Sequence, residues 1–277
     1  MALKIATNVI SQQVQNSLSS STKRSGEALQ KLSSGSRINK AGDDAAGLAI
    51  VQRLRATTKS LAQATRNAND GISYIQTAEG ALNETSNIVI RLRELAIQAS
   101  SDTIGDNERA LLDQERIQLV EEIDRIAHST EFNGSELING QGKESLSFHI
   151  GYKAGDENKI VYNAGHTDAT TSSLGIDSLD ISNQQDAESG IERLDEAIDH
   201  ISGFRANLGS LQSRLQSTIN NLHVQRISQD SARSAIQDTD VAEQASQLAR
   251  LDVIKQAGIA SLASANSLPN SALRLLI

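Results

Sequence analysis

Hydrophobic side chains recur every seven residues over a long stretch of the N-terminal half of the chain. The first series of these positions is Leu61, Ala68, Ile75, Leu82, Val89 and Ala96. The companion series is Ala64, Gly71, Ala78, Thr85, Leu92 and Ala99. Two such series are typical of a helix that packs in coiled-coil fashion, so the pattern predicts a helix over 46–100. Asn69-Asp70-Gly71 would ordinarily indicate a turn, but the repeat continues through it in phase, so the helix is expected to continue as well.

Two further helices are expected from similar spacing. The first covers 106–130 and follows a polar loop in which Asp106 or Asn107 is expected to cap it. The second covers 186–235, where the apolar positions of 191–222 are on average about 3.4 residues apart, close to the repeat of a coiled coil.

Between these two helices the hydrophobic pattern changes to alternation. The residues that alternate with polar side chains or glycine are Leu146, Phe148, Ile150 and Tyr152. A turn and a second short apolar run follow, so the pattern predicts one β-hairpin at about 145–163. The polar segment 167–173 is expected to be a loop. The fold is therefore predicted to be mainly α: a long antiparallel coiled-coil-like helical bundle with a small β-hairpin region and paired N- and C-terminal helices.

The two ends of the chain are amphipathic but carry few charges. The charged residue in segment 1–22 is Lys4, and the charged residues among the last 25 are Lys255 and Arg274. A final helix is expected over 241–265. The terminal helices either close a bundle within the chain, or find partners only in other copies and become ordered on assembly. The apolar positions proposed for assembly are Leu3, Ile10, Val14, Leu18, Leu248, Leu251, Ile259 and Leu262.

Composition supports an elongated helical protein and excludes several other classes. Aromatic residues are only 2% of the 277 residues, so Ala, Leu, Ile and Val must supply the core, as in long packed helices. The net charge of −8 argues against a general nucleic-acid binder. The chain has no cysteine for disulfides or thiolate metal sites, and neither a membrane span nor a secretory signal peptide is apparent. An extracellular location would therefore require another export route.

The stretch KLSSGSRINKAGDDAAGLAI interrupts the helical pattern with three glycines and the carboxylate pair Asp43–Asp44. Two carboxylates could form a catalytic or metal site, but adjacent side chains point in different directions on a helix or a strand. The alternative is structural: an Asp at a helix start accepts hydrogen bonds from free backbone N–H groups. Because phosphate-loop, zinc-protease and nucleophile-elbow motifs are also missing, we expect no enzyme activity and no cofactor.

Several segments resemble bacterial flagellin, and together they cover nearly the whole chain. The N-terminal segments are LSSGSRINKAGDDAAGLAI, NDGISYIQTAEGALNETSNIVIRLRELAIQA and EEIDRIAHSTEFNG. The C-terminal segments are RANLGSLQSRLQSTINNL and QAGIASLASANSLPNSALRLL. The resemblance implies an inner domain of residues 1–45 and 236–277 and an outer domain of residues 46–235. The large variable outer domain of many flagellins is missing, because little chain separates Gly134 from the returning helix.

The resemblance also implies a function and a set of partners. The expected function is that of a structural subunit that polymerises into the flagellar filament for swimming or swarming. The alternatives are a hook–filament junction protein, a cytosolic coiled-coil adaptor or a metal enzyme. The implied partners are other flagellin subunits, an export chaperone, the filament cap and hook-junction proteins. Neither binding to nucleic acid nor a membrane span is expected. The expected location is the extracellular filament, reached through the flagellar export apparatus without a cleaved signal peptide.

Three groups of residues follow from the resemblance. The interrupting stretch would connect the inner and outer layers through Gly35, Arg37, Asn39, Asp43, Asp44 and Gly47. Recognition of free subunits by the flagellin-sensing Toll-like receptor of a host would involve Arg91, Leu95 and Glu115, with Ile90 at a position that is often Gln. O-linked glycans, as in some flagellins, could be attached to Thr170, Thr171, Ser172 and Ser173, whereas the alternative for this segment is a simple polar loop.

Overall fold

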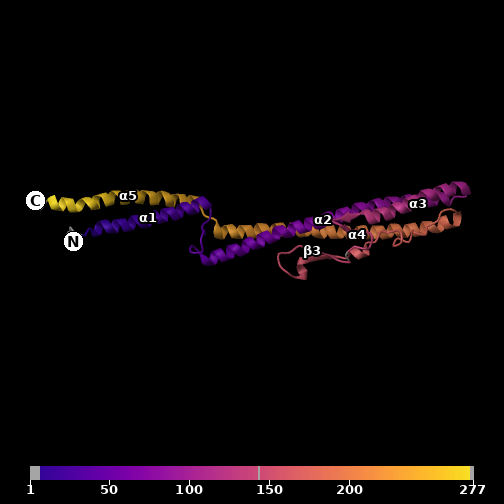
Figure 1. Cartoon of the computed structure of the whole chain (residues 1–277), viewed down its shortest axis with the longest axis horizontal. Coiled ribbons are helices and arrows are strands. Elements are labelled where there is room, and N and C mark those ends of the chain that lie inside the picture. The colour runs from indigo at the N-terminus through magenta and orange to yellow at the C-terminus, as the bar shows by residue number, and fades with distance from the viewer. Residues whose placement is uncertain (1–6, 143, 275–277) are drawn as a thin grey trace. The chain divides into compact units, whose positions relative to one another are not determined.

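The computed structural model describes residues 7–142 and 144–274. The helices are α1 Val9–Ser34, α2 Ala45–Ala99, α3 Asp106–Ser129, α4 Gln184–Gln237 and α5 Val241–Arg274 (Figure 1). The strands are β1 Glu131–Phe132, β2 Ser135–Glu136, β3 Leu146–His149 and β4 Lys159–Tyr162, and two short 3₁₀ helices are Asp156–Asn158 and Ala164–His166. The predicted fold class, mainly α with a small region of antiparallel strands, is confirmed.

The chain forms two compact units. The first consists of Met1–Ala56 and Ser228–Ile277, and the second of Thr57–Ile227. Helices α2 and α4 therefore contribute residues to both units. The two layers that the resemblance implies, with boundaries at residues 45 and 236, stay a prediction.

The heptad positions of α2 form the core of the second unit. Leu82, Val89 and Leu92 are completely inaccessible to solvent, and both predicted series are buried along their whole length. They pack beside α4, whose inward positions are buried in the same way (Figure 1). This burial stabilises the unit mainly through the hydrophobic effect, because the positions are almost all aliphatic.

Helix α2 continues through Gly71, as the heptad pattern predicts. A Cβ atom at this position would lie 3.0 Å from Cδ1 of Phe148 and 3.2 Å from Cδ1 of Leu215. Glycine thus lets a side chain from β3 and one from α4 approach the helix closely. The turn signal in Asn69-Asp70-Gly71 is overridden by this packing.

Two hairpins, rather than the single one predicted, pack on α2. The predicted hairpin is β3–β4, with Leu146 opposite Tyr162 and Phe148 opposite Ile160. The second hairpin is β1–β2, which turns at Asn133 and Gly134 with φ angles of 51° and 75°. An Asn-Gly pair with two positive φ angles suits a two-residue hairpin loop, so the Asn133-Gly134 dipeptide is a local signal for this turn, just beyond the predicted end of the helix at residue 130.

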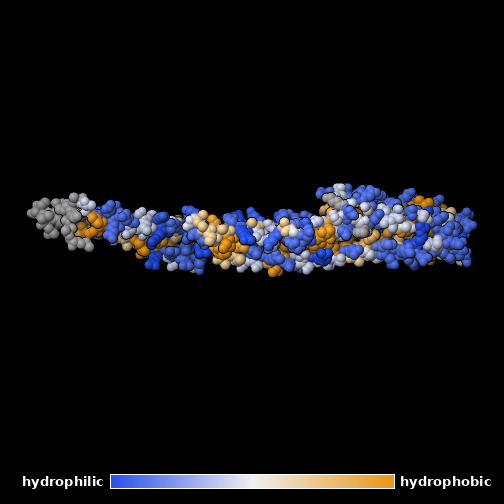
Figure 2. Space-filling model, turned by 90° about the horizontal axis from the view of Figure 1, so that it is seen from below, coloured by the Kyte–Doolittle hydropathy of each residue, from blue (hydrophilic) through white to orange (hydrophobic). Residues whose placement is uncertain are grey.

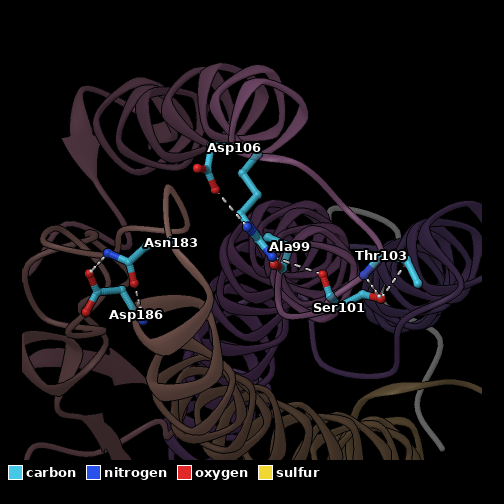
Figure 3. Close-up of polar contacts among 7 residues, drawn as sticks. Ala99, Ser101, Thr103, Asp106, Asn183 and Asp186 are labelled. Carbon is cyan, nitrogen blue, oxygen red and sulfur yellow. Dashed lines mark hydrogen bonds and ion pairs between the residues drawn. The ribbon is translucent and has the colours of Figure 1, made fainter.

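The start of α3 differs from the prediction. Its N-cap residue is Gly105, which has no side chain to accept a hydrogen bond, so the prediction of a cap by Asp106 or Asn107 is wrong. Asp106 instead lies 3.0 Å from the Arg109 guanidinium (Figure 3). Buried Arg109 also donates from Nε to Ala99 O at 2.8 Å and from Nη2 to Ser101 O at 3.0 Å. The guanidinium therefore satisfies the carbonyl of Ala99 at the C-terminal end of α2 and that of Ser101 in the turn that follows.

In the first unit, α1 and α5 lie side by side in opposite directions (Figure 1). Asn8 caps α1 by accepting from Ser11 N at 3.0 Å, and its Nδ2 donates to Ala265 O at 2.7 Å. Ser11 Oγ donates to Asn266 Oδ1 at 2.8 Å. The predicted pairing of the terminal helices is confirmed, and α5 extends nine residues beyond the predicted end, from 265 to Arg274.

Candidate assembly and recognition surfaces

The terminal helices leave a large part of their apolar side chains exposed. The exposed apolar side chains include Val9 at 59%, Ile10 at 51%, Val253 at 65%, Ile254 at 43% and Ile259 at 53%. We call these five residues the terminal-helix surface. Figure 2 shows hydrophobic side chains at the surface, among hydrophilic ones, along this part of the molecule. Apolar side chains that stay exposed along one pair of helices are candidates for contacts with another molecule.

The residues proposed for assembly differ in how deeply they are buried. Ile10 and Ile259 are exposed, whereas Leu251 is buried between the helices. The partly buried residues are Val14, Leu18, Leu248 and Leu262. Leu3 lies outside the described residues. A single pair of helices can bury only one side of each, which leaves the remaining apolar side chains for other contacts.

A shallow groove runs between α1 and α5. Val14 and Leu18 line it from one helix, and Ile254 and Gly258 line it from the other. A Cβ atom at residue 258 would lie 3.3 Å from Cδ1 of Leu18, so the glycine allows the two helices to approach each other closely. The remaining lining side chains are small or uncharged polar groups, so little desolvation cost opposes covering this groove.

The segment after α1 pairs with the segment between α4 and α5. Gly35 ends α1 in the left-handed conformation, with φ 67°, and its carbonyl accepts from Thr239 N at 3.0 Å. Arg37 N donates to Gln237 O at 2.6 Å, and Arg37 Nη2 donates to Ile236 O at 2.7 Å. A β-bridge joins Ser36 and Asp238. These hydrogen bonds fix the two segments to each other within the first unit.

The two adjacent carboxylates bind different backbone groups. Asp43 Oδ2 accepts from the N–H groups of Asn39 and Lys40, each at 2.9 Å, and these hydrogen bonds hold the pKa of Asp43 below its usual value. Asp44 Oδ1 accepts from Gly47 N at 2.8 Å, as expected for a carboxylate that caps the start of α2. Because each carboxylate closes its own turn, the pair does not converge on a substrate or metal.

Glycine has a clear steric role at position 47. A Cβ atom there would overlap the Asp44 carboxylate and lie 2.8 Å from Cδ1 of Ile38, which is 3% exposed. The capping carboxylate and Ile38 thus occupy the space that a side chain would need. Gly42 has open space around it, and nothing in the structure explains a glycine there.

The residues proposed for receptor recognition lie on α2 and α3 of the second unit. Arg91 donates from Nη2 and Nε to Glu115 Oε1, at 2.8 and 3.0 Å, and from Nη1 to Glu94 Oε2 at 3.0 Å. The side chains of Arg91 and Glu115 are about half exposed. Leu95 is completely buried, so its side chain supports this face from the core and is not available for direct contact.

The loop proposed for glycosylation contains hydroxyl groups in different surroundings. Buried Thr171 donates from Oγ1 to Asp124 Oδ2 at 2.7 Å, and its N–H donates to Asp124 Oδ1 at 2.9 Å. Thr170 is partly buried and donates from Oγ1 to Asp168 Oδ1 at 2.7 Å. Only Ser172 and Ser173 of the four proposed acceptors are exposed. Thr171 instead fixes the loop to α3.

Neither a metal cluster nor a membrane span occurs in the described part of the chain. Among residues 7–142 and 144–274, no group of three or more His, Cys, Asp or Glu side chains is arranged to hold a metal ion. None of the helices in these ranges is long and apolar enough to span a membrane.

Comparison with protein-family models gives two matches. Residues 5–143 match the bacterial flagellin N-terminal helical region, and residues 191–276 match the bacterial flagellin C-terminal helical region. The matches include α1 to α3 at one end and nearly all of α4 and α5 at the other.

Similar proteins include two flagellins of known source. The chain is 42% identical to the flagellin of Halalkalibacterium halodurans over 255 residues, which cover 90% of this chain and 91% of the relative. It is 38% identical to the flagellin of Bacillus subtilis over 99% of this chain and all of the relative. The crystal structure of Bacillus cereus flagellin superposes with a TM-score of 0.51 at 32% identity, covering 57% of this chain and 88% of that structure.

Proposed function

The chain belongs to the bacterial flagellin family, and from this premise we propose how its surfaces build the flagellar filament. It is a structural subunit of that extracellular filament, and the family is one of structural proteins. Contacts between copies involve the apolar side chains of α1 and α5, and further flagellar proteins meet the subunit before and after assembly.

The terminal-helix surface is the observation on which this proposal rests. In the second unit the inward positions of α2 are buried almost completely, whereas on α1 and α5 Ile10 and Ile259 remain about half exposed. Covering such side chains contributes about 25 cal/mol for each Å² of apolar surface removed from water. One face of a subunit can contact a different face of the next copy. If the rotation between neighbouring subunits does not close the series into a ring, an open helical filament results.

Assembly also supplies the partners that a single pair of helices lacks. In this proposal the terminal helices reach their full order only when neighbouring copies cover them, so folding of the ends is coupled to growth. An export chaperone would cover the same apolar side chains before export, and the filament cap and junction proteins would meet them at the two ends of the filament. Export would proceed through the flagellar apparatus without a cleaved signal peptide.

Recognition by the flagellin-sensing Toll-like receptor is proposed for free subunits through the exposed Arg91–Glu115 pair, with Leu95 maintaining the face from beneath. Glycans, where they occur, are proposed on Ser172 and Ser173. We assign no catalytic role to the chain, because Asp43 and Asp44 bind backbone N–H groups of their own turns.

Elongation from filament seeds tests the proposed assembly surface. Purified subunit is added to short filament fragments, and growth is measured by electron microscopy for Val253→Gln, Ile259→Gln and the control Gln256→Ala, which truncates an exposed polar side chain of the same helix. We expect at least roughly tenfold slower growth for the two apolar replacements, because hydrophobic residues at the centre of an interface dominate its affinity. Normal growth of both apolar variants would refute the assignment of this surface.

A further inference from the structure

The chain contains two Asn-Gly pairs, and the structure places them in opposite surroundings. Asn133 and Gly134 form the exposed loop of the β1–β2 hairpin. Asn139 is 3% exposed and is followed by Gly140. Glycine after asparagine leaves its backbone nitrogen sterically open to attack the asparagine side chain, because it carries no Cβ. We infer that Asn133 is a site of spontaneous deamidation in the folded protein and that Asn139 is protected.

The chemistry requires only water. The backbone nitrogen of Gly134 attacks Cγ of Asn133 and loses its proton, the bond from Cγ to Nδ2 breaks, and the side-chain nitrogen leaves as ammonia. The resulting succinimide ring is opened by one water molecule at either of its two carbonyl groups. Opening at one carbonyl gives aspartate and opening at the other gives isoaspartate. Overall, one water is consumed and one ammonia is released, with no oxidation or reduction.

The loop around Asn133 is held by a very short hairpin. Only two residue pairs form the β1–β2 ladder, and one of them places Glu131 directly opposite Glu136. Two like charges in directly opposed positions destabilise a pair of strands, and beyond the two ladder pairs only one further backbone hydrogen bond, from Leu137 N to Thr130 O at 3.1 Å, extends this hairpin. Local opening of the loop is therefore easy, and it gives the Gly134 nitrogen the freedom to reach Cγ.

Asn139 is restrained by its side chain and by its backbone. Its Nδ2 donates to Glu136 Oε2 at 2.5 Å, and its Oδ1 accepts from Gln141 N at 3.1 Å. A β-bridge joins Asn139 to Asp168, and the next ladder contact is Ala169 N to Ile138 O at 2.8 Å. These contacts hold the carboxamide away from the attack geometry, and Asn139 can react only after the region unfolds.

Deamidation at Asn133 would loosen the packing of both hairpins on α2. An isoaspartyl residue adds a methylene group to the backbone of a two-residue loop, so the pairing of Phe132 with Ser135 cannot be kept in register. Phe132 packs edge-on against Tyr74, with 5.9 Å between ring centroids, and Tyr74 also contacts Phe148 of β3. The modification would therefore reach the aromatic contacts that hold the hairpins to the helix.

One peptide reports on both sites. Cleavage after Arg125 and Lys143 releases IAHSTEFNGSELINGQGK, which contains both Asn133 and Asn139 and so exposes them to identical handling. The full chain is incubated in its folded state in mildly alkaline buffer and then digested rapidly. Tandem mass spectrometry of this peptide measures, at each asparagine, the mass change from replacement of NH₂ by OH. Isoaspartate is counted with an isoaspartate-specific methyltransferase. We expect Asn133 to convert roughly tenfold faster than Asn139 in the folded chain, because only Asn139 needs local unfolding.

Two controls make the result decisive. In the denatured chain both Asn-Gly pairs should convert at similar rates, which shows that the folded structure causes the difference. Glu131→Lys should slow conversion of Asn133 by about two- to threefold, because it replaces a repulsive cross-strand pair by an attractive one. The matched change Glu121→Lys, on the exposed surface of α3, should leave the rate unchanged. Equal rates in the folded chain, or no slowing by Glu131→Lys, would overturn the inference.

Discussion

The ring of Tyr74 on α2 lies edge-on to the ring of Phe132 on β1, with centroids 5.9 Å apart and an angle of 73° between the ring planes. Tyr74 makes a similar contact with Phe148 on β3, at 6.1 Å. Three of the six aromatic residues thus meet at one place, where both hairpins contact the long helix. Tyr74 is 6% exposed, and this burial raises the pKa of its phenol to about 12.

The first prediction concerns alkaline stability. A phenol with a folded pKa of about 12 and an unfolded pKa of 10.0 stays neutral when folded but ionises when unfolded, so its contribution is fully present below pH 10. Stability should then fall as pH rises from about 10 to 12, by up to about 2–3 kcal/mol. Denaturant unfolding at several pH values, followed by tyrosine near-UV circular dichroism, measures this fall.

Tyr74→Phe is the matched control for this titration. It keeps the ring contacts and removes the ionisable group, so the loss of stability above pH 10 should be much smaller. A smaller residual loss is expected from Tyr162, whose pKa is also raised by burial. If Tyr74→Phe shows the same alkaline loss as the unmodified chain, burial of Tyr74 is not its cause.

The second prediction compares two glycines of α2. Gly71→Ala should destabilise the second unit by about 1–2 kcal/mol, because crowding against Phe148 and Leu215 exceeds the gain in helix propensity. Gly80→Ala should stabilise it by about 0.5–1 kcal/mol, because that position is exposed and has no atom within 4 Å of the added Cβ. Urea unfolding of both variants gives the two signs, and stabilisation by Gly71→Ala would contradict the packing argument.

These two glycines also illustrate how much of the fold the sequence could predict. The heptad positions of α2 determine its burial, and the pattern through Gly71 predicted the helix correctly despite the turn signal. The reason for a glycine there is a contact with Phe148, more than seventy residues away, which no local pattern contains. Periodicity reports on the face of a helix, but it does not identify the partner side chain.

The candidate site shows the same limit. The role of Asp44 as a helix cap could be predicted from its place before an apolar run, because capping is a local interaction. The pairing of Arg37 with Gln237 could not be predicted, since it joins segments two hundred residues apart. The burial of Leu95 and of Thr171 was missed for a related reason, because the exposure of a residue depends on the elements packed against it. Leu95 lies in the hydrophobic core of the second unit, and Thr171 is hydrogen-bonded to Asp124 of α3.

The third prediction concerns the buried guanidinium at the α2–α3 turn. Arg109→Lys should cost about 2–4 kcal/mol, because an ammonium cannot donate to Ala99 O and Ser101 O with the same planar geometry. Arg125→Lys, at an exposed pair with Glu122, should change stability by less than about 0.5 kcal/mol. Thermal and urea unfolding measure the stability of both variants. Equal losses would show that burial of the Arg109 guanidinium does not increase its contribution to stability.

The last prediction separates the two adjacent carboxylates by amide hydrogen exchange. Asp43→Ala should speed exchange at the Asn39 and Lys40 amides, since it removes their acceptor, and should leave Gly47 unchanged. Asp44→Ala should do the reverse and should weaken the start of α2 by about 1 kcal/mol.

Acid provides a second test of the same assignment. Because the hydrogen bonds lower the pKa of Asp43 below 3.8, its contribution is present above that value and is lost only as pH falls through the lower folded pKa. Protection at Asn39 and Lys40 should therefore persist at pH 3.8 and disappear in stronger acid. If both substitutions changed all three amides alike, the carboxylates would be acting together, and the separation of their roles would be wrong.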